Sequence, residues 1–211
     1  MTEALENKLR EIEESKDHHL SLCETMLRAG DSKLFSMDIM VAAAIKRSLA
    51  LSDAFASLVR SQNYSIAASL CRLQLDSCLR LSAAYRVQDP HQLASDVLAG
   101  KPIRKMKDRD GQKMTDRYLS ETLGLELDWV PRVYNSTSGF IHLSEKHLVS
   151  IFGEMDSDTG RTSIEIGPGD QNIPNQYWLE MASGFLATTD LLIQYVEGWI
   201  SAKNRNSGSQ K

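Results

Sequence analysis

Two groups of polar residues have the spacing of one face of a helix and could do chemistry together. Arg72, Asp76 and Arg80 follow one another at intervals of four residues in an otherwise apolar segment, so they share one side of a helix. A second polar stripe lies later in the chain and consists of Asn135, Ser138, His142 and Glu145. If the two helices pack together, a guanidinium, a carboxylate, a hydroxyl and an imidazole meet, which suits phosphate binding or metal-independent cleavage of a phosphodiester.

These residue types predict distinct roles. In the catalytic scheme Asp76 orients the imidazole of His142, Arg72 holds an anion, and Ser138 supplies a hydroxyl one turn from the histidine. Ligand-binding roles are predicted for Arg80 and Asn135. A structural interpretation stays open beside this one, in which the arginine–aspartate ladder is a salt-bridge face and His142 is a hydrogen-bonded core histidine.

A basic segment lies between these two stripes. Between Gly100 and Tyr118 the basic residues outnumber the acidic ones by seven to three, and we predict that Lys105 and Lys107 contact the ligand from this loop. The alternative is that the loop is only a solvated connection.

The composition and net charge of the chain argue against several classes of ligand. The chain has 211 residues, of which 42% are hydrophobic and 25% charged, with a net charge of -4; these values are typical of one globular domain and argue against binding to duplex DNA or an anionic membrane. RNA contacts would have to be local. The sequence contains neither a phosphate-binding loop nor a dinucleotide fingerprint, and no cysteines or histidines at zinc-ligand spacing, so we predict no cofactor and no metal.

Cysteine usage indicates a compartment. Of the three cysteines, Cys71 and Cys78 stand two turns apart on one expected helix, roughly 10.5 Å and too far for a disulfide. Since no leader and no apolar run of membrane-spanning length is visible, we expect a reduced, cytoplasmic protein.

Hydrophobic periodicity predicts a mainly α fold, a multi-helix bundle with one β-hairpin near the C-terminal third. We expect one domain over residues 1–203, with a core over 30–147, a hairpin over 148–167 and a last helix over 175–203, followed by a disordered tail over 204–211. Asp128 is expected to cap a helix that runs through Ile141 and fades around Ser144 to Leu148. The narrow apolar stripe of the first helix, which includes Leu20 and Leu27, suits packing on its own bundle or pairing with a second copy as a homodimer.

Three runs of this sequence resemble a known group of proteins. They are Cys71–Tyr85, Asp110-Gly-x-x-Met-Thr-Asp116 and Tyr134-Asn-Ser-Thr-Ser-Gly-Phe-Ile-His142. They look like the Arg-x-x-x-Glu and Tyr-x-x-x-Ser-x-x-x-His helices of uncharacterised bacterial helical-bundle proteins related to the HEPN and abortive-infection group, with Asp76 where the pattern more often has glutamate.

The resemblance implies a function in phage defence or a toxin–antitoxin system, with a polar pocket for a phosphate-bearing ligand or RNA. HEPN ribonucleases place an arginine and a histidine, with four to six residues between them in the sequence, at a dimer interface. Arg86 and His91 have this spacing, but Pro90 would interrupt a helix that carried both. The alternative function is a non-enzymatic protein–protein interaction module, a dimerising bundle in which the polar cluster is structural.

Overall fold

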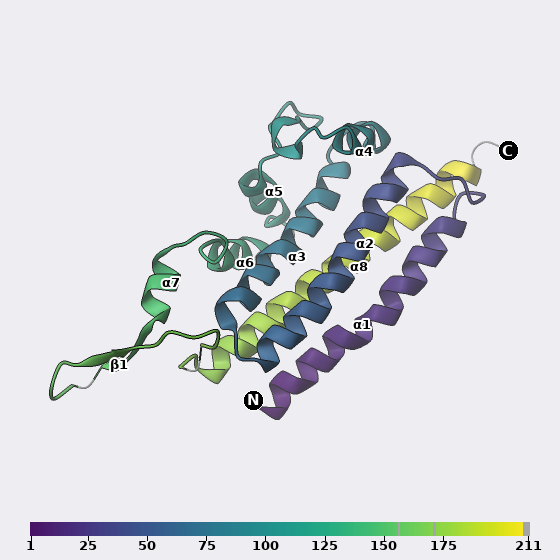
Figure 1. Ribbon diagram of the computed structural model, residues 1–211. Helices are drawn as coiled ribbons and strands as arrows, with labels where there is room; N and C mark the ends of the chain where they lie inside the picture. Colours follow the sequence, from purple (N-terminus) through teal and green to yellow (C-terminus); the bar gives the residue numbers. More distant parts are fainter. Residues whose placement is uncertain (156, 171, 209–211) are drawn as a thin grey trace.

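The computed structural model describes residues 1–155, 157–170 and 172–208 and has the predicted architecture, a helical bundle with one late hairpin (Figure 1). Four long helices form the bundle: α1 (Glu3–Arg28), α2 (Ser36–Arg60), α3 (Tyr64–Ala84) and α8 (Asn175–Gly208). α1 contacts α2 and α8, and α3 contacts the same two helices from the other side. Among the helices of the described residues, none has the length and apolar character needed to cross a membrane.

Shorter elements cover one side of the bundle. α4 (Pro90–Leu98) packs mainly on α2, and α5 (Asp116–Leu123) and α6 (Trp129–Ser138) pack on α3, with a 3-10 turn η1 (Ile103–Lys105) between α4 and α5 along the chain (Figure 1). α7 (Glu145–Ser150) and the antiparallel strands β1 (Phe152–Met155) and β2 (Thr162–Ile164) then form an arm that protrudes from the bundle. Through α5 and α6, the segment that follows α3 in the sequence covers the polar face of α3.

The core consists of two apolar clusters separated by one polar layer. One cluster is built around the stacked rings of Phe55 and Phe185, whose centroids are 4.2 Å apart; the other fills the far half of the bundle. The layer between them takes one residue from each long helix: His19, Ser48, Gln74 and Thr189. All four are buried, and hydrogen bonds connect them.

Three expectations about element boundaries are wrong. α6 ends at Ser138 instead of reaching Ile141. Hydrogen-bonded turns follow it over Gly139–Ile141, and the carbonyl of Gly139 accepts a hydrogen bond from the hydroxyl of Ser144. Leu148 lies in α7 rather than in a strand. α8 continues to Gly208, so residues 204–208 are helical, and the rest of the expected tail, 209–211, lies outside the described residues.

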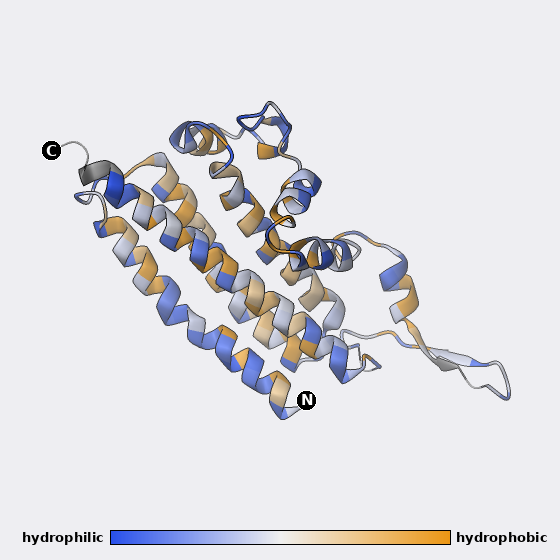
Figure 2. Ribbon diagram, turned by 180° about the vertical axis from the view of Figure 1, so that it is seen from behind, coloured by the Kyte–Doolittle hydropathy of each residue, from blue (hydrophilic) through white to orange (hydrophobic). Residues whose placement is uncertain are grey.

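A further correction concerns which residues form the buried stripe of α1. After Ile12 the helix buries His19, Leu22 and Met26, while Leu20 and Leu27 are exposed. Figure 2 shows the hydrophilic outer face of this helix, which is packed on its own bundle.

Candidate functional site

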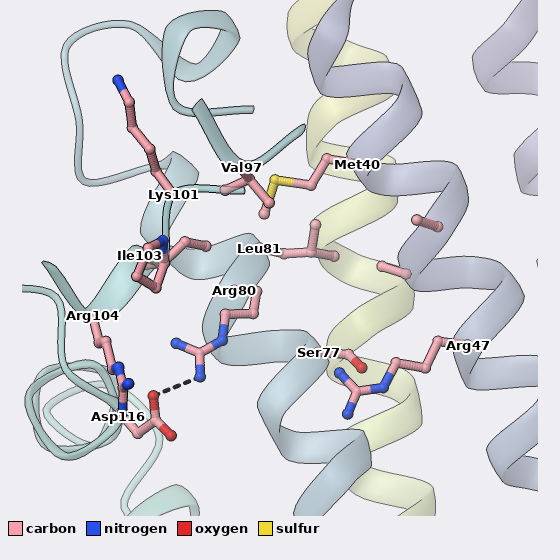
Figure 3. A pocket seen from close by; sticks show the side chains of 13 residues that line it. Met40, Arg47, Ser77, Arg80, Leu81, Val97, Lys101, Ile103, Arg104 and Asp116 are labelled. Atoms are coloured by element: carbon pink, nitrogen blue, oxygen red, sulfur yellow. Dashed lines mark hydrogen bonds and ion pairs between the residues drawn. The ribbon is translucent and has the colours of Figure 1, made fainter. Parts of the chain in front are cut away.

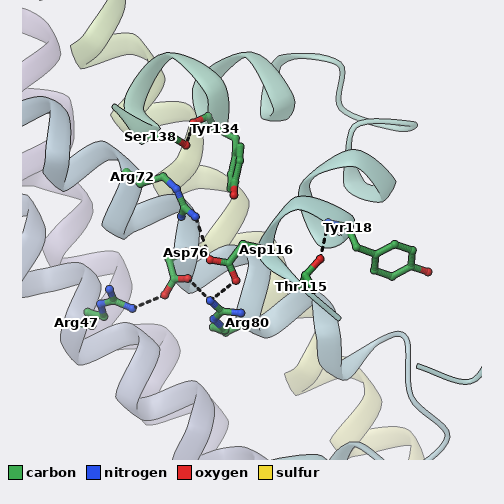
Figure 4. A network of polar contacts seen from close by, with 9 residues as sticks. All are labelled: Arg47, Arg72, Asp76, Arg80, Thr115, Asp116, Tyr118, Tyr134 and Ser138. Atoms are coloured by element: carbon green, nitrogen blue, oxygen red, sulfur yellow. Dashed lines mark hydrogen bonds and ion pairs between the residues drawn. The ribbon is translucent and has the colours of Figure 1, made fainter. Parts of the chain in front are cut away.

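The predicted ladder on α3 exists, but its partners differ from those expected. The guanidinium of Arg80 donates to Asp76 over 2.6 Å. Arg72, by contrast, donates to Asp116, over 3.1 Å, and not to Asp76. Asp116 also accepts a 2.6 Å hydrogen bond from Arg80 (Figure 4). The ladder is therefore closed by a carboxylate from another helix.

Asp116 is a site residue to which sequence reasoning gave no role. It is the first residue of α5, and the side chain of Thr115 caps this helix by accepting a hydrogen bond from the amide of Tyr118. A carboxylate in the first helical turn is favourable because it faces the positive end of the helix dipole. The sequence signal for this helix cap was the Thr115–Asp116 pair before an amphipathic segment. The sequence could not predict which arginines Asp116 contacts, because that depends on the packing of α5 on α3.

A third arginine joins from α2. Arg47 donates to Asp76 over 3.0 Å, so three guanidinium groups and two carboxylates form one continuous network (Figure 4). At its other end the Arg72 guanidinium lies 4.4 Å from the centre of the Tyr134 ring, in cation–π contact. Burial lowers the pKa of Arg80, but the charges of Asp76 and Asp116 outweigh this effect and raise the pKa above its usual value, which keeps this guanidinium charged.

The network lines two cavities, and Asp116 borders both. The first, which we call the His142 cavity, has a volume of about 500 Å³. All four residues predicted as catalytic line it: Arg72, Asp76, Ser138 and His142. The other lining residues are Leu73, Asp116, Tyr134 and Ile141. The packing of α6 on α3 thus brings Arg72 and Asp76 of the first predicted stripe and Ser138 and His142 of the second to one cavity.

The side chains in the His142 cavity are not arranged as the catalytic scheme requires. His142 is exposed in the turn after α6, and no hydrogen bond or ion pair joins its ring to other described residues. Asp76 is engaged by Arg47 and Arg80 instead of orienting the imidazole. The hydroxyl of Ser138 donates to the carbonyl of Tyr134.

The second cavity, the arginine cavity, has a volume of about 640 Å³ and lies between α2, α3 and the segment around η1 (Figure 3). Its charged lining residues are Arg47, Arg80, Lys101, Arg104 and Asp116. The ammonium of Lys101 is 2.8 Å from Asp96, and Figure 3 shows it pointing away from the cavity. The charged side chains that face the cavity are therefore three arginines and one aspartate.

The residues predicted to bind the ligand do not all line a cavity. Arg80 lines the arginine cavity. Among the described residues, the linings of these two cavities include neither Asn135 nor the loop lysines Lys105 and Lys107, all three of which are exposed. Arg104 of the turn η1 lines the arginine cavity instead. Which basic residue of this turn faces the cavity depends on how the turn is oriented.

Arg86 and His91, the pair with HEPN-like spacing, do not share a helix. α3 ends at Ala84 and α4 begins at Pro90, as the proline predicted. The His91 ring packs against the rings of Phe35 and Trp199, with centroids 5.0 and 5.3 Å away.

Comparison of the chain with models of known protein families, with curated proteins and with solved structures finds no match.

Proposed function

We propose that this protein binds a phosphate-bearing ligand in the arginine cavity, with the phosphate on Arg80 and Arg104 and with Arg47 as a further cationic group of the lining. The observation that carries the proposal is the guanidinium of Arg104, which lines the cavity and has no ion pair or hydrogen bond to any other described residue. An anion bound there would complete a site in which the other two arginines are already held in place.

The held arginines keep donors for a ligand. Within the described residues, Arg80 uses its Nη2 atom for both aspartates and Arg47 uses Nη1 for Asp76. A guanidinium has five N–H donors in a planar fork, so each retains groups that can reach a phosphate. Because Asp76 and Asp116 restrict these side chains before binding, less conformational entropy is lost when the ligand arrives.

The experiment that tests this proposal is calorimetric titration with inorganic phosphate. Arg104→Ala should weaken binding by about 10- to 150-fold, since a charge-assisted hydrogen bond contributes about 1.5–3 kcal/mol. The melting temperature should be unchanged because Arg104 holds nothing else. Arg132→Ala is the matched control, as Arg132 is an exposed arginine on α6 paired with Asp128. Equal affinities in the two variants would refute the proposal.

Catalysis at the His142 cavity is a separate proposal, supported by the shared lining of Arg72, Ser138 and His142. If these residues cleave RNA without a metal, His142→Ala should abolish cleavage measured in the presence of a chelator. The same variant should melt within about 1 °C of the unmodified chain, because exposed side chains without contacts contribute little to stability. A loss of several degrees with cleavage intact would favour a structural role.

The proposal retains the expected relationship to HEPN-type bundles, with a role in defence, and a cytoplasmic location. All three cysteines, Cys23, Cys71 and Cys78, are free thiols in the structure, which accords with a reducing compartment.

The arm favours the alternative of an interaction module. Exposed apolar residues gather on and beside it: Leu143, Leu148, Val149, Phe152, Ile164 and Ile166. A patch of this kind on a two-stranded hairpin is typical of a surface that binds a protein, including a second copy. Light scattering after size-exclusion chromatography would measure a dimer, and Leu148→Glu with Ile166→Glu should convert it to a monomer; a monomer in the unmodified chain at high concentration would eliminate homodimerisation.

A further inference from the structure

The residues that line the arginine cavity indicate what the ligand contains besides its phosphate group. Apart from Ser77, the uncharged lining residues are aliphatic: Met40, Ala43, Ala44, Leu81, Val97, Pro102 and Ile103. Figure 3 shows the guanidinium groups of Arg80 and Arg104 beside Asp116 on one side, whereas Met40, Val97 and Leu81 meet on another. The cavity is thus amphipathic, with an anion-binding side and an apolar side.

The size of the cavity exceeds what a free phosphate needs. A volume of about 640 Å³ lies in the range of sites that hold whole organic molecules, roughly 300–1,000 Å³. Small residues on α2 keep the space open, because Ala43 and Ala44 stand where larger side chains would fill it. Apolar surface left in contact with water is unfavourable, and an apolar group of a ligand would cover it.

The charge around the cavity suits one phosphate group and not a polymer of them. Three guanidinium groups line it, and Asp76 and Asp116 already partly neutralise two of them. A polynucleotide needs a track of cations along its backbone. Here Lys101 is paired with Asp96 and the chain as a whole is acidic.

The geometry points to a small amphipathic phosphate monoester as the ligand, with its phosphate on Arg80 and Arg104 and its apolar body against the aliphatic wall formed by α2, α3, α4 and Ile103. This inference rests on the proposed function, which names only the phosphate. It commits in addition to an apolar body and to a ligand of small size.

Three probes test it by calorimetry: inorganic phosphate, n-hexyl phosphate and a single-stranded RNA oligomer. Hexyl phosphate should bind at least tenfold more tightly than inorganic phosphate, since each buried methylene contributes about fourfold to affinity. Ala43→Phe fills the apolar side and should reduce this ratio to near one. Ala50→Phe is the matched control on an exposed position of α2, and the ratio should remain at least tenfold.

The outcomes separate this inference from the proposed function. Equal affinities for hexyl phosphate and inorganic phosphate would overturn the inference and leave phosphate binding intact. Absence of binding by both would overturn the two together. Tighter binding of RNA, lost in Arg104→Ala, would overturn the small-ligand inference in favour of a polynucleotide.

Discussion

A buried ion pair at one end of the bundle gives a sharp test of how the fold is held together. The ammonium of Lys203 on α8 lies 2.9 Å from the carboxylate of Asp38 on α2, with side-chain exposures of 1% and 0%. Asp38 also accepts a 2.7 Å hydrogen bond from the indole of Trp199, and Lys203 donates to the carbonyl of Met26 over 3.0 Å. The pair therefore connects α1, α2 and α8.

Lys203→Met removes the cation and leaves the carboxylate of Asp38 buried. Breaking a buried pair in this way costs about 3–5 kcal/mol, because the remaining charge is neither solvated nor compensated. For a chain of this length each kcal/mol corresponds to roughly 2–4 °C, so the melting temperature should fall by about 6–20 °C. The double variant with Asp38→Asn should recover part of the loss, since it removes the stranded charge.

Urea unfolding followed by circular dichroism measures this cost. The matched control is Lys101→Met, which breaks a pair of almost identical length, 2.8 Å to Asp96, at 62% and 25% exposure. Exposed pairs contribute about 0–1 kcal/mol. If Lys203→Met and Lys101→Met lower the free energy of unfolding equally, burial does not determine the strength of these pairs and the reasoning is refuted.

Two further perturbations follow from the packing. Burial lowers the pKa of His19 below 6.5, its ordinary value, so the unfolded chain takes up a proton that the folded chain excludes; stability should be unaffected above about pH 6.5 and decline as the pH falls below it. The free energy of unfolding of His19→Gln, measured by denaturation across this pH range, should decline less than that of the unmodified chain. Identical pH profiles for the two proteins would contradict the prediction. Gly124→Ala should destabilise the fold by about 1–3 kcal/mol, because the new Cβ would lie 2.4 Å from the ring of Pro131. Gly167→Ala, where a Cβ meets nothing within 4 Å, is its control, and equal thermal unfolding curves for the two variants would show that the Pro131 contact is not tight.

Sequence periodicity was sufficient to predict the bundle and the shared face of Arg72, Asp76 and Arg80, because a spacing of four residues on one helix is a local property. It was not sufficient to predict the partners. Asp116 and Arg47 reach the ladder from other helices, and their positions depend on packing between segments far apart in the chain.

The errors have the same physical origin. α6 was expected to carry His142, but the helix ends at Ser138 and the carbonyl of Gly139 accepts a hydrogen bond from Ser144. In the basic loop, charge alone could not distinguish Lys105 from Arg104, because which of them faces the cavity depends on one short turn.

The most direct test of the central claim is to observe the arginine side chains while phosphate is added. In ¹H–¹⁵N spectra of the arginine Nε–H groups, titration with inorganic phosphate should shift Arg80 and Arg104 along saturating curves with one shared dissociation constant. Arg132, exposed and outside the lining of the arginine cavity, should not move. Shifts of equal size at all three positions, or none at Arg104, would contradict a phosphate site in the arginine cavity.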